Sequence, residues 1–260
     1  MSKSKGVLLL YSESKQLDYK RLAKLSARLA ENYLNVPSTI IKLDNIHENT
    51  RTFRYEEGVE TIEWNNIGRH DAYNLSPYDE TILIDSDYFI QNNNLANYFG
   101  SVHDLLCHNT SWDITGNEIF RHNRFLANGG NGFEMQWATV LYFKKSEHAK
   151  RVFQVWKKVF QNYDYYGKLL GFRRSPFRND FALSVAHHIC NGYTNTNTFA
   201  HDLPAISTTD NVIDYGNNNW LIRYNLKNSK NIIRYKGDLH VMNKKCILDT
   251  GVYNKLWDSI

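Results

Sequence analysis

The stretch ETILIDSDYFIQNN, residues 80–93, contains the pattern that decides the fold and points to a site. A short apolar run over residues 81–84 is typical of a buried strand, and it leads directly into Asp85-Ser86-Asp87. Residues i and i+2 of a strand share a face, so both carboxylates converge if the chain bends there. Two such charges repel each other unless a cation lies between them. Mg²⁺ or Mn²⁺, which bridges carboxylates to phosphates, is the natural partner.

The position of the two carboxylates supports the same interpretation. Ligands of open α/β sheets bind outside the carboxyl ends of the strands, which is where Asp85 and Asp87 stand in the sequence. The alternative is that Asp85 caps a turn while Asp87 faces water. The buried run before the motif favours a site for a metal ion and a diphosphate.

Composition places the chain among globular proteins. It has 260 residues, 42% of them hydrophobic and 22% charged, which suffices for a sizeable core. No apolar run approaches the ~20 residues of a membrane span, and residues 7–11 are too short for a secretory segment. We therefore expect a cytoplasmic protein with no membrane partner. Three scattered cysteines, in no CxxC pair, are expected to be free thiols.

Apolar periodicity predicts a single α/β domain with a mixed sheet. Strands are expected at 6–11, 38–43, 81–84 and 137–143, with a possible strand at 59–63 and strand-like pieces at 220–224 and 231–235. Helices are expected at 18–34, 146–162 and 179–191, with partial helix over 92–106. The first strand, helix and second strand form a β-α-β start, which implies parallel strands. The remainder of 44–79 and a Gly/Asn loop at 124–134 are expected to be irregular.

Four segments, in order, carry a resemblance to a known family. YDETILIDSDYFI (78–90) resembles the DxD strand of GT-A glycosyltransferases, Rossmann-like enzymes that use nucleotide sugars. NGFEMQWATVLYFKKSEHAKRVFQVWKK (131–158) is similar to a strand and helix of glycogenin-like members. RNDFALSVAHH (178–188) resembles a helix start under the donor sugar, and LHVMNKK (239–245) resembles the C-terminal metal- and diphosphate-binding tail.

The resemblance implies a single GT-A domain over residues 1–260, with two halves that bind different substrates. A nucleotide-sugar-binding half would occupy about residues 1–100, and an acceptor-binding half with the C-terminal tail about residues 101–260. The tail departs from the family pattern His-x-x-Gly-x-x-Lys, because Cys246 stands six residues after His240. The nearest lysines are Lys244 and Lys245, and Lys244 is assigned to the diphosphate.

The resemblance also implies roles for individual residues. Asp85, Asp87 and His240 would bind Mn²⁺ or Mg²⁺, and Lys244 would contact the diphosphate of a nucleoside-diphosphate sugar, with UDP as the expected nucleotide. Asp85 could alternatively contact the ribose, and His240 could be an ordinary surface histidine.

Three further positions are implied around the donor. Tyr11, at the end of the first strand in LLYSES, would stack on the base, or else belong to the core. Arg69, in GRHDAY, would contact the donor phosphate or nucleoside, or else be a surface arginine. Asp180, in RNDFA, would act in catalysis by touching the donor sugar or acceptor, or else merely cap its helix. The resemblance favours retention of configuration, as in the glycogenin-like type.

The acceptor is predicted from residues 163–178, YDYYGKLLGFRRSPFR, where tyrosines and phenylalanines alternate with cations. Cations that contact phosphates, interleaved with rings that stack, suit nucleic acid. With the Asn, Lys and Tyr bias, the pattern resembles phage-encoded GT-A enzymes that glycosylate hydroxymethylated bases. Double-stranded DNA, bound through Arg173, Arg174 and Arg178 in the host cytoplasm, is the predicted acceptor. An exposed basic loop without that role is the alternative.

Other functions stay open at the level of sequence. The same hexosyl- or pentosyltransferase chemistry could act on a glycan or a protein. A two-metal nuclease or nucleotidyltransferase also uses paired aspartates but needs a third carboxylate on a neighbouring strand, and none stands beside an apolar run. A protein that binds a nucleotide sugar without turnover is the remaining alternative.

Overall fold

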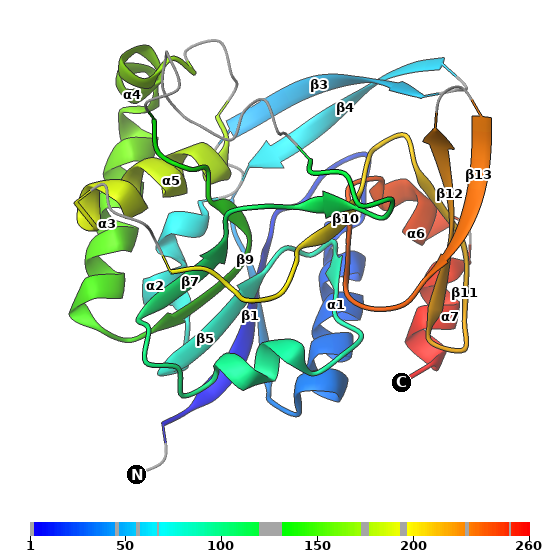
Figure 1. Ribbon diagram of the computed structural model, residues 1–260, viewed down its shortest axis with the longest axis horizontal. Helices are drawn as coiled ribbons and strands as arrows, with labels where there is room; N and C mark the ends of the chain where they lie inside the picture. The colour runs from blue at the N-terminus through cyan, green and yellow to red at the C-terminus, as the bar shows by residue number, and fades with distance from the viewer. Residues whose placement is uncertain are drawn as a thin grey trace.

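The fold is built around a five-stranded mixed sheet (Figure 1). The structure is a computed structural model that describes residues 3–44, 47–55, 58–66, 68–119, 132–172, 177–192, 197–226, 229–249 and 251–260. The sheet has the order β2-β1-β5-β9-β7. Its strands are β1 (Lys5–Tyr11), β2 (Ser38–Lys42), β5 (Glu80–Ile84), β7 (Leu105–His108) and β9 (Trp137–Lys144). β1 pairs in parallel with β2 and β5, whereas β9 runs antiparallel to β5 and β7. The predicted mixed α/β sheet and its four main strands are confirmed.

Helices cover this sheet and confirm the predicted pattern. In Figure 1, α1 lies to the right of the sheet, and α3 and α5 lie to the left. The helices are α1 (Tyr19–Leu34), α2 (Ala72–Leu75), α3 (Glu147–Gln161), α4 (Tyr163–Leu170), α5 (Asn179–Cys190), α6 (Lys244–Asp249) and α7 (Val252–Asp258). Asp18 caps α1 by accepting the Arg21 N–H at 2.9 Å, and Ser146 caps α3 by accepting the Ala149 N–H at 3.2 Å. The described helices include none that is long and apolar enough to cross a membrane.

Three smaller sheets surround the central one and depart from the sequence-based expectation. One sheet has four strands in the order β6 (Tyr88–Phe89), β14 (Leu239–Val241), β10 (Pro204–Ile206) and β8 (Trp112–Asp113). A second has three strands in the order β11 (Asn211–Gly216), β12 (Asn219–Leu226) and β13 (Ser229–Tyr235). The third pairs β3 (His47–Tyr55) with β4 (Gly58–Asn66). The expected pieces at 220–224 and 231–235 are confirmed within β12 and β13. The possible strand at 59–63 is confirmed within β4. The irregular structure predicted for the remainder of 44–79 is wrong where β3 pairs with β4 in a hairpin.

The segment 92–106 contains less helix than predicted. A single 3-10 helix, η2, spans Asn94–Tyr98, and β7 begins at Leu105. A second 3-10 helix, η1, spans Arg69–Asp71. Most of the Gly/Asn loop predicted at 124–134 lies outside the described residues. All three cysteines are free, as expected.

Helix α1 links two hydrophobic cores. Its small residues, Ala23, Ala27 and Ala30, pack in the core of the central sheet. Its leucines, Leu22, Leu25 and Leu29, pack instead with side chains of β11, β12, β14, α6 and α7. One helix therefore holds the C-terminal elements in register with the central sheet.

Leu25 tests this bridging role. We expect Leu25→Ala to lower the free energy of unfolding by about 2–5 kcal/mol, because the fully buried side chain leaves a cavity between α1 and the C-terminal elements. Lys24→Ala, on the exposed side of the same helix, should change it by less than about 0.5 kcal/mol. Urea denaturation measures both. Equal losses in the two variants would contradict a core contact at Leu25.

Candidate active site

The Asp85-Ser86-Asp87 segment is a turn that connects two sheets. β5 ends at Ile84 in the central sheet, and β6 begins at Tyr88 in the sheet that contains β14. The Asp85 N–H donates to the Thr139 carbonyl of β9 at 2.9 Å, and the Tyr88 N–H donates to the Asp85 carbonyl at 3.1 Å. These bonds fix a bend at the end of the buried strand, which is the condition under which the two carboxylates were expected to converge.

Strand β14 brings His240 to this turn. It pairs antiparallel with β6, with His240 opposite Tyr88, and the Val241 N–H donates to the Asp87 carbonyl at 2.9 Å. One ligand atom from each of Asp85, Asp87 and His240 lies within 4.8 Å of the others. His240 is buried, so the alternative of a surface histidine is wrong. His240 is 153 positions after Asp87 in the chain, and the pairing of β14 with β6 brings the two residues together.

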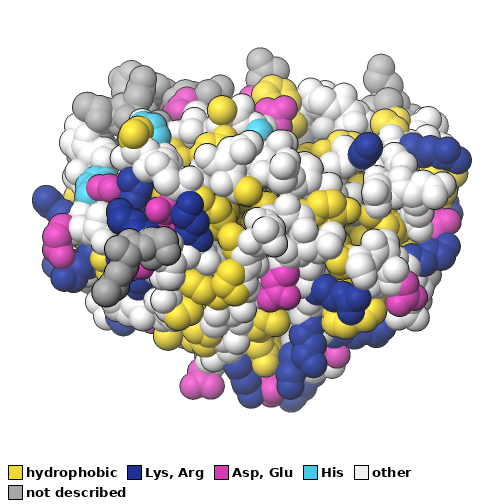
Figure 2. Space-filling view, turned by 90° about the horizontal axis from the view of Figure 1, so that it is seen from below, with side chains coloured by type: hydrophobic (Ala, Val, Ile, Leu, Met, Phe, Trp, Pro, Cys, Tyr) yellow, Lys and Arg dark blue, Asp and Glu magenta, His cyan; other side chains and the backbone are white. Residues whose placement is uncertain are grey.

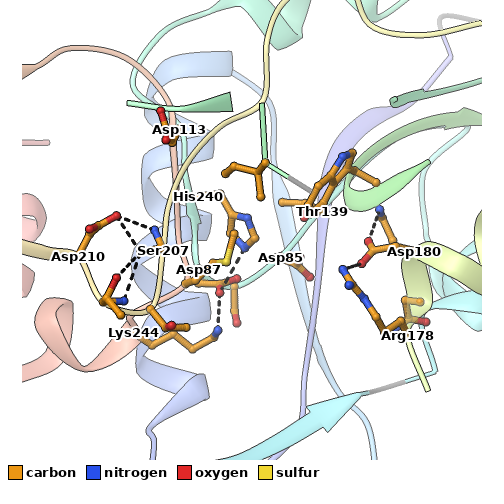
Figure 3. Close-up of a pocket in the computed structure, with 18 of the residues that line it drawn as sticks. Asp85, Asp87, Asp113, Thr139, Arg178, Asp180, Ser207, Asp210, His240 and Lys244 are labelled. Atoms are coloured by element: carbon orange, nitrogen blue, oxygen red, sulfur yellow. Dashed lines mark hydrogen bonds and ion pairs between the residues drawn. The ribbon is translucent and has the colours of Figure 1, made fainter. Parts of the chain in front are cut away.

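Two basic groups converge on the Asp87 carboxylate, as Figure 3 shows. Lys244 Nζ lies 2.6 Å from Asp87 Oδ2, and His240 Nε2 lies 3.5 Å from the same oxygen. Burial by itself raises the pKa of the Asp87 carboxyl. The Lys244 ammonium and the His240 imidazole more than offset this effect and hold the pKa well below its usual range. Asp87 is thus a buried carboxylate that stays charged.

Asp85 has a separate counter-ion. Arg69, in η1, is buried and forms an ion pair with the Asp85 carboxylate. Burial lowers the pKa of Arg69 to about 10, and the nearby Asp180 and Asp87 carboxylates act in the opposite direction. The guanidinium lines the pocket, so the alternative of a surface arginine is wrong. Protein cations already neutralise both aspartates, so repulsion between them does not by itself require a metal ion, contrary to the sequence-based argument.

The donor set nevertheless fits a divalent ion. Two carboxylates and an imidazole are suitable ligands for Mn²⁺ or Mg²⁺. His240 Nδ1 is buried and has no hydrogen-bond partner among the described residues. Within the same described part of the chain, Nε and Nη2 of Arg69 are likewise buried donors without an acceptor. Unused buried donors and acceptors of this kind point to a polar ligand.

These groups open into a pocket of about 470 Å³ at the carboxyl ends of β1 and β5. Tyr11, the last residue of β1, and Tyr19, the first of α1, both line it. Burial raises the pKa of Tyr19, with the Asp87 charge adding to this effect and Lys244 opposing it. Of the residues proposed from sequence, the pocket gathers Tyr11, Arg69, Asp85, Asp87, Asp180, His240 and Lys244. Their positions agree with the predicted site, and their individual roles stay predictions.

Asp180 has structural contacts on both carboxylate oxygens (Figure 3). Oδ1 accepts the Ala138 N–H of β9 at 2.9 Å, and Oδ2 pairs with Arg178 Nη2 at 2.8 Å. It does not cap α5, because the residue at the cap position is Arg178 and no side-chain cap bond forms. The carboxylate joins the start of α5 to the start of β9, at the wall of the pocket. A catalytic role for Asp180 stays a prediction.

The segment predicted to bind DNA is arranged differently from the expectation. Phe172 and Phe177 are buried and pack on Tyr163, with ring centroids 5.2 and 4.9 Å apart. Arg178 turns into the pocket and pairs with Asp180. Arg173 and Arg174 lie outside the described residues. Figure 2 shows Lys and Arg side chains toward both margins of one face, with Asp and Glu among them.

Sequence reasoning missed Asp238, which positions His240. Its Oδ1 accepts the N–H groups of Gln91 and Asn92 at 2.6 and 3.1 Å, and its Oδ2 accepts the Tyr88 hydroxyl at 3.3 Å. Burial raises its pKa to about 6. Asp238, the residue before β14, is thus joined to the residues that follow β6. A lone Asp two positions before a histidine carries no sequence signal, so only the fold reveals it.

Comparisons with known proteins give structural likeness only. No protein-family model matches the chain, and no curated protein matches it. The solved galactosyltransferase LgtC, in complex with donor and acceptor sugar analogues, is similar at a TM-score of 0.42 and 11% identity, over 69% of this chain and 70% of LgtC. The glycosyltransferase GlyE of Streptococcus pneumoniae TIGR4 gives 0.35 and 11%, over 70% of this chain and 42% of GlyE.

A third solved structure is a mutant of Drosophila β1,4-galactosyltransferase 7 in complex with manganese, UDP-Gal and xylobiose. It gives a TM-score of 0.38 and 12% identity, over 76% of this chain and 66% of that chain. At these scores and identities the likeness does not assign a family. The function of this chain is therefore inferred from its own site.

The two contacts of Asp180 generate a prediction about stability. Asp180→Ala removes the acceptor of the Ala138 N–H and the partner of Arg178, so we expect the free energy of unfolding to fall by about 1–3 kcal/mol. Asp180→Asn keeps an acceptor for the amide and should lose less. Chemical denaturation of both variants measures the difference. Wild-type stability in Asp180→Ala would show that neither contact supports the fold.

Proposed function

We propose that this protein is a metal-dependent glycosyltransferase that moves a sugar from a nucleoside-diphosphate sugar to a hydroxyl acceptor. One observation carries the proposal: the convergence of Asp85, Asp87 and His240, flanked by Lys244 and Arg69, in a pocket at the carboxyl ends of parallel strands. These ligand types suit a divalent ion bound to a diphosphate, and the neighbouring cations suit its phosphate oxygens. UDP is the proposed nucleotide, and Mn²⁺ or Mg²⁺ the proposed ion.

The pocket residues divide the work of the proposed reaction. A divalent ion held by Asp85, Asp87 and His240 would act as a Lewis acid on the leaving diphosphate. The buried donors of Arg69 and the ammonium of Lys244 would bind diphosphate oxygens and stabilise the charge that develops as the sugar–oxygen bond breaks. Tyr11 offers a ring for the base at the end of β1, and Asp180 and Arg178 form the wall nearest to β9.

The acceptor proposed from sequence is a hydroxymethylated base of double-stranded DNA, with the chain encoded by a phage. The buried phenylalanines and the inward Arg178 do not support residues 163–178 as a DNA surface. A glycan or protein hydroxyl, the alternative acceptor, fits a pocket that is also lined by the polar side chains of Asn117, Ser207 and Thr209. Both acceptors share the same donor chemistry.

The rival classes have less support. Among the described residues, Asp85, Asp87 and His240 form the one group of three or more candidate ligands, and a two-metal site needs more carboxylates than this. The pocket is also lined by three other carboxylates, which already have hydrogen-bond partners. Asp180 accepts from Ala138 and Arg178. Asp113 accepts from Thr115 and Asn117, and Asp210 accepts from Ser207. A binding protein without turnover would share the site, and transfer assays separate it from an enzyme.

Donor binding provides the first test. A thermal-shift screen of nucleoside diphosphates and their sugars should give a stabilisation of roughly 2.7 kcal/mol at a hundredfold excess over Kd, and only when Mn²⁺ or Mg²⁺ is present. Asp87→Asn should abolish both this shift and sugar transfer, because it removes a metal ligand. Asp258→Asn, at an exposed position outside the pocket, is the control and should behave as wild type. Full transfer in excess EDTA would exclude the proposed mechanism.

The two acceptors are separated by salt dependence. If duplex DNA is the acceptor, log Kd should change by ~0.9 per log unit of salt for each phosphate neutralised, and Arg173→Ala with Arg174→Ala should flatten that slope. Labelling of hydroxymethylated DNA and of an oligosaccharide mixture with a radioactive nucleotide sugar measures the choice directly. Labelling of the oligosaccharide alone would exclude DNA as the acceptor.

A further inference from the structure

Lys244 occupies an unusual position for a diphosphate-binding residue. It is the first residue of α6, its side chain is 8% exposed, and its ammonium lies 2.6 Å from Asp87 Oδ2. That same oxygen lies 3.5 Å from His240 Nε2. A carboxylate that is a candidate metal ligand is therefore held by a protein cation at hydrogen-bonding distance.

We propose that Lys244 and the divalent ion compete for Asp87, and that a diphosphate relieves this competition by accepting the Lys244 ammonium. Metal and diphosphate would then bind cooperatively, each tightening the other. This inference rests on the proposed function, and it concerns how the same site is loaded.

The charges around the motif show why competition follows. Asp85 and Asp87 carry two negative charges, and Arg69 and Lys244 already balance them one to one. A divalent ion that binds these carboxylates brings two further positive charges to within a few ångströms of the ammonium. In a buried site such like charges repel strongly, so either the ion binds weakly or a protein cation withdraws.

Of the two cations, Lys244 is the one able to move. Arg69 is a buried residue whose rigid, planar guanidinium is paired with Asp85. Lys244 has a flexible four-carbon side chain, and its ammonium lies 6.0 Å from the centre of the Tyr19 ring, on the pocket wall. A diphosphate bound to the metal would place anionic oxygens in this pocket, where the ammonium could pair with them instead of with Asp87.

Cooperativity of this kind is reciprocal and measurable. If the diphosphate raises the affinity for the metal by some factor, the metal raises the affinity for the diphosphate by the same factor. The coupling should depend on Lys244, because that residue is in contact with Asp87 and within reach of the diphosphate.

The experiment titrates Mn²⁺ into the full chain with and without UDP and measures free Mn²⁺ by electron paramagnetic resonance. We expect Lys244→Met to bind Mn²⁺ alone at least about tenfold more tightly than wild type, since a like charge is removed from the site. UDP should tighten Mn²⁺ binding in wild type by a larger factor than in Lys244→Met. Lys255→Met is the matched control, because Lys255 forms a 2.5 Å ion pair with Asp214 outside the pocket, and it should behave as wild type.

A stability measurement covers the case in which the variant folds poorly. Lys244→Met leaves Asp87 without its closest cation, so its Tm in EDTA should fall below that of wild type. Mn²⁺ should then raise the Tm of the variant by more than it raises that of wild type. Equal or smaller shifts, or equal Mn²⁺ affinities, would overturn the competition.

The outcomes separate this inference from the proposed function. Sugar transfer by wild type, with Mn²⁺ affinities that Lys244→Met leaves unchanged, would overturn the competition and leave the function in place. Tighter Mn²⁺ binding in Lys244→Met, with no sugar transfer by wild type, would overturn the function and leave the competition.

Discussion

The buried carboxylate of Asp87 is the interaction on which the site depends. Its side chain binds Lys244 and lies next to His240, and its backbone carbonyl accepts the Val241 N–H. One residue thus attaches the end of β5 to β14 and to the start of α6. Burying the Asp87 charge costs free energy, and its partners offset this cost only while they stay in place. A movement of Lys244 or His240 away from Asp87 would therefore destabilise the fold as well as change the site.

The rest of the structure keeps those partners in place. Helix α1 packs on the central sheet through its alanines and on the C-terminal elements through its leucines. The Ser26 hydroxyl of the same helix donates to the Tyr88 carbonyl at 2.5 Å, directly beside the motif. Asp238 holds the other side of β6. The turn is therefore supported from both sides by groups that do not line the pocket.

Three carboxylates of the pocket form ion pairs with cations. Asp85 pairs with Arg69, Asp87 with Lys244, and Asp180 with Arg178. The Lys244 pair keeps the buried Asp87 carboxylate ionised without a bound ion, and the three pairs place cations in the pocket where the proposed diphosphate would bind. A ligand that brings both a divalent ion and a diphosphate can exchange partners with these pairs while adding little net charge. This property would suit the proposed function, in which the site binds and releases a highly charged donor.

The sequence by itself determined the local features. Apolar periodicity located β1, α1, β2, β5, β9, α3 and α5, and Asp18 signalled the start of α1. The apolar run before the DxD motif indicated where the buried strand β5 ends. These signals are local, since each depends on residues within one or two turns of chain.

The resemblance proposed that His240 and Lys244 join the two aspartates, but only the tertiary structure decided which distant residues meet. The pairing of β6 with β14 brings His240 to Asp87, and it depends on two short strands with no periodic signal. The same is true of Lys244, whose pairing with Asp87 no spacing could indicate, and of Arg178, which the sequence assigned to an outer surface. Of the hairpin of β3 and β4 only a possible strand at 59–63 was predicted, because its strands carry polar residues at most positions. Long-range pairing depends on the free energy of packing the whole chain, so no single segment of the sequence determines it.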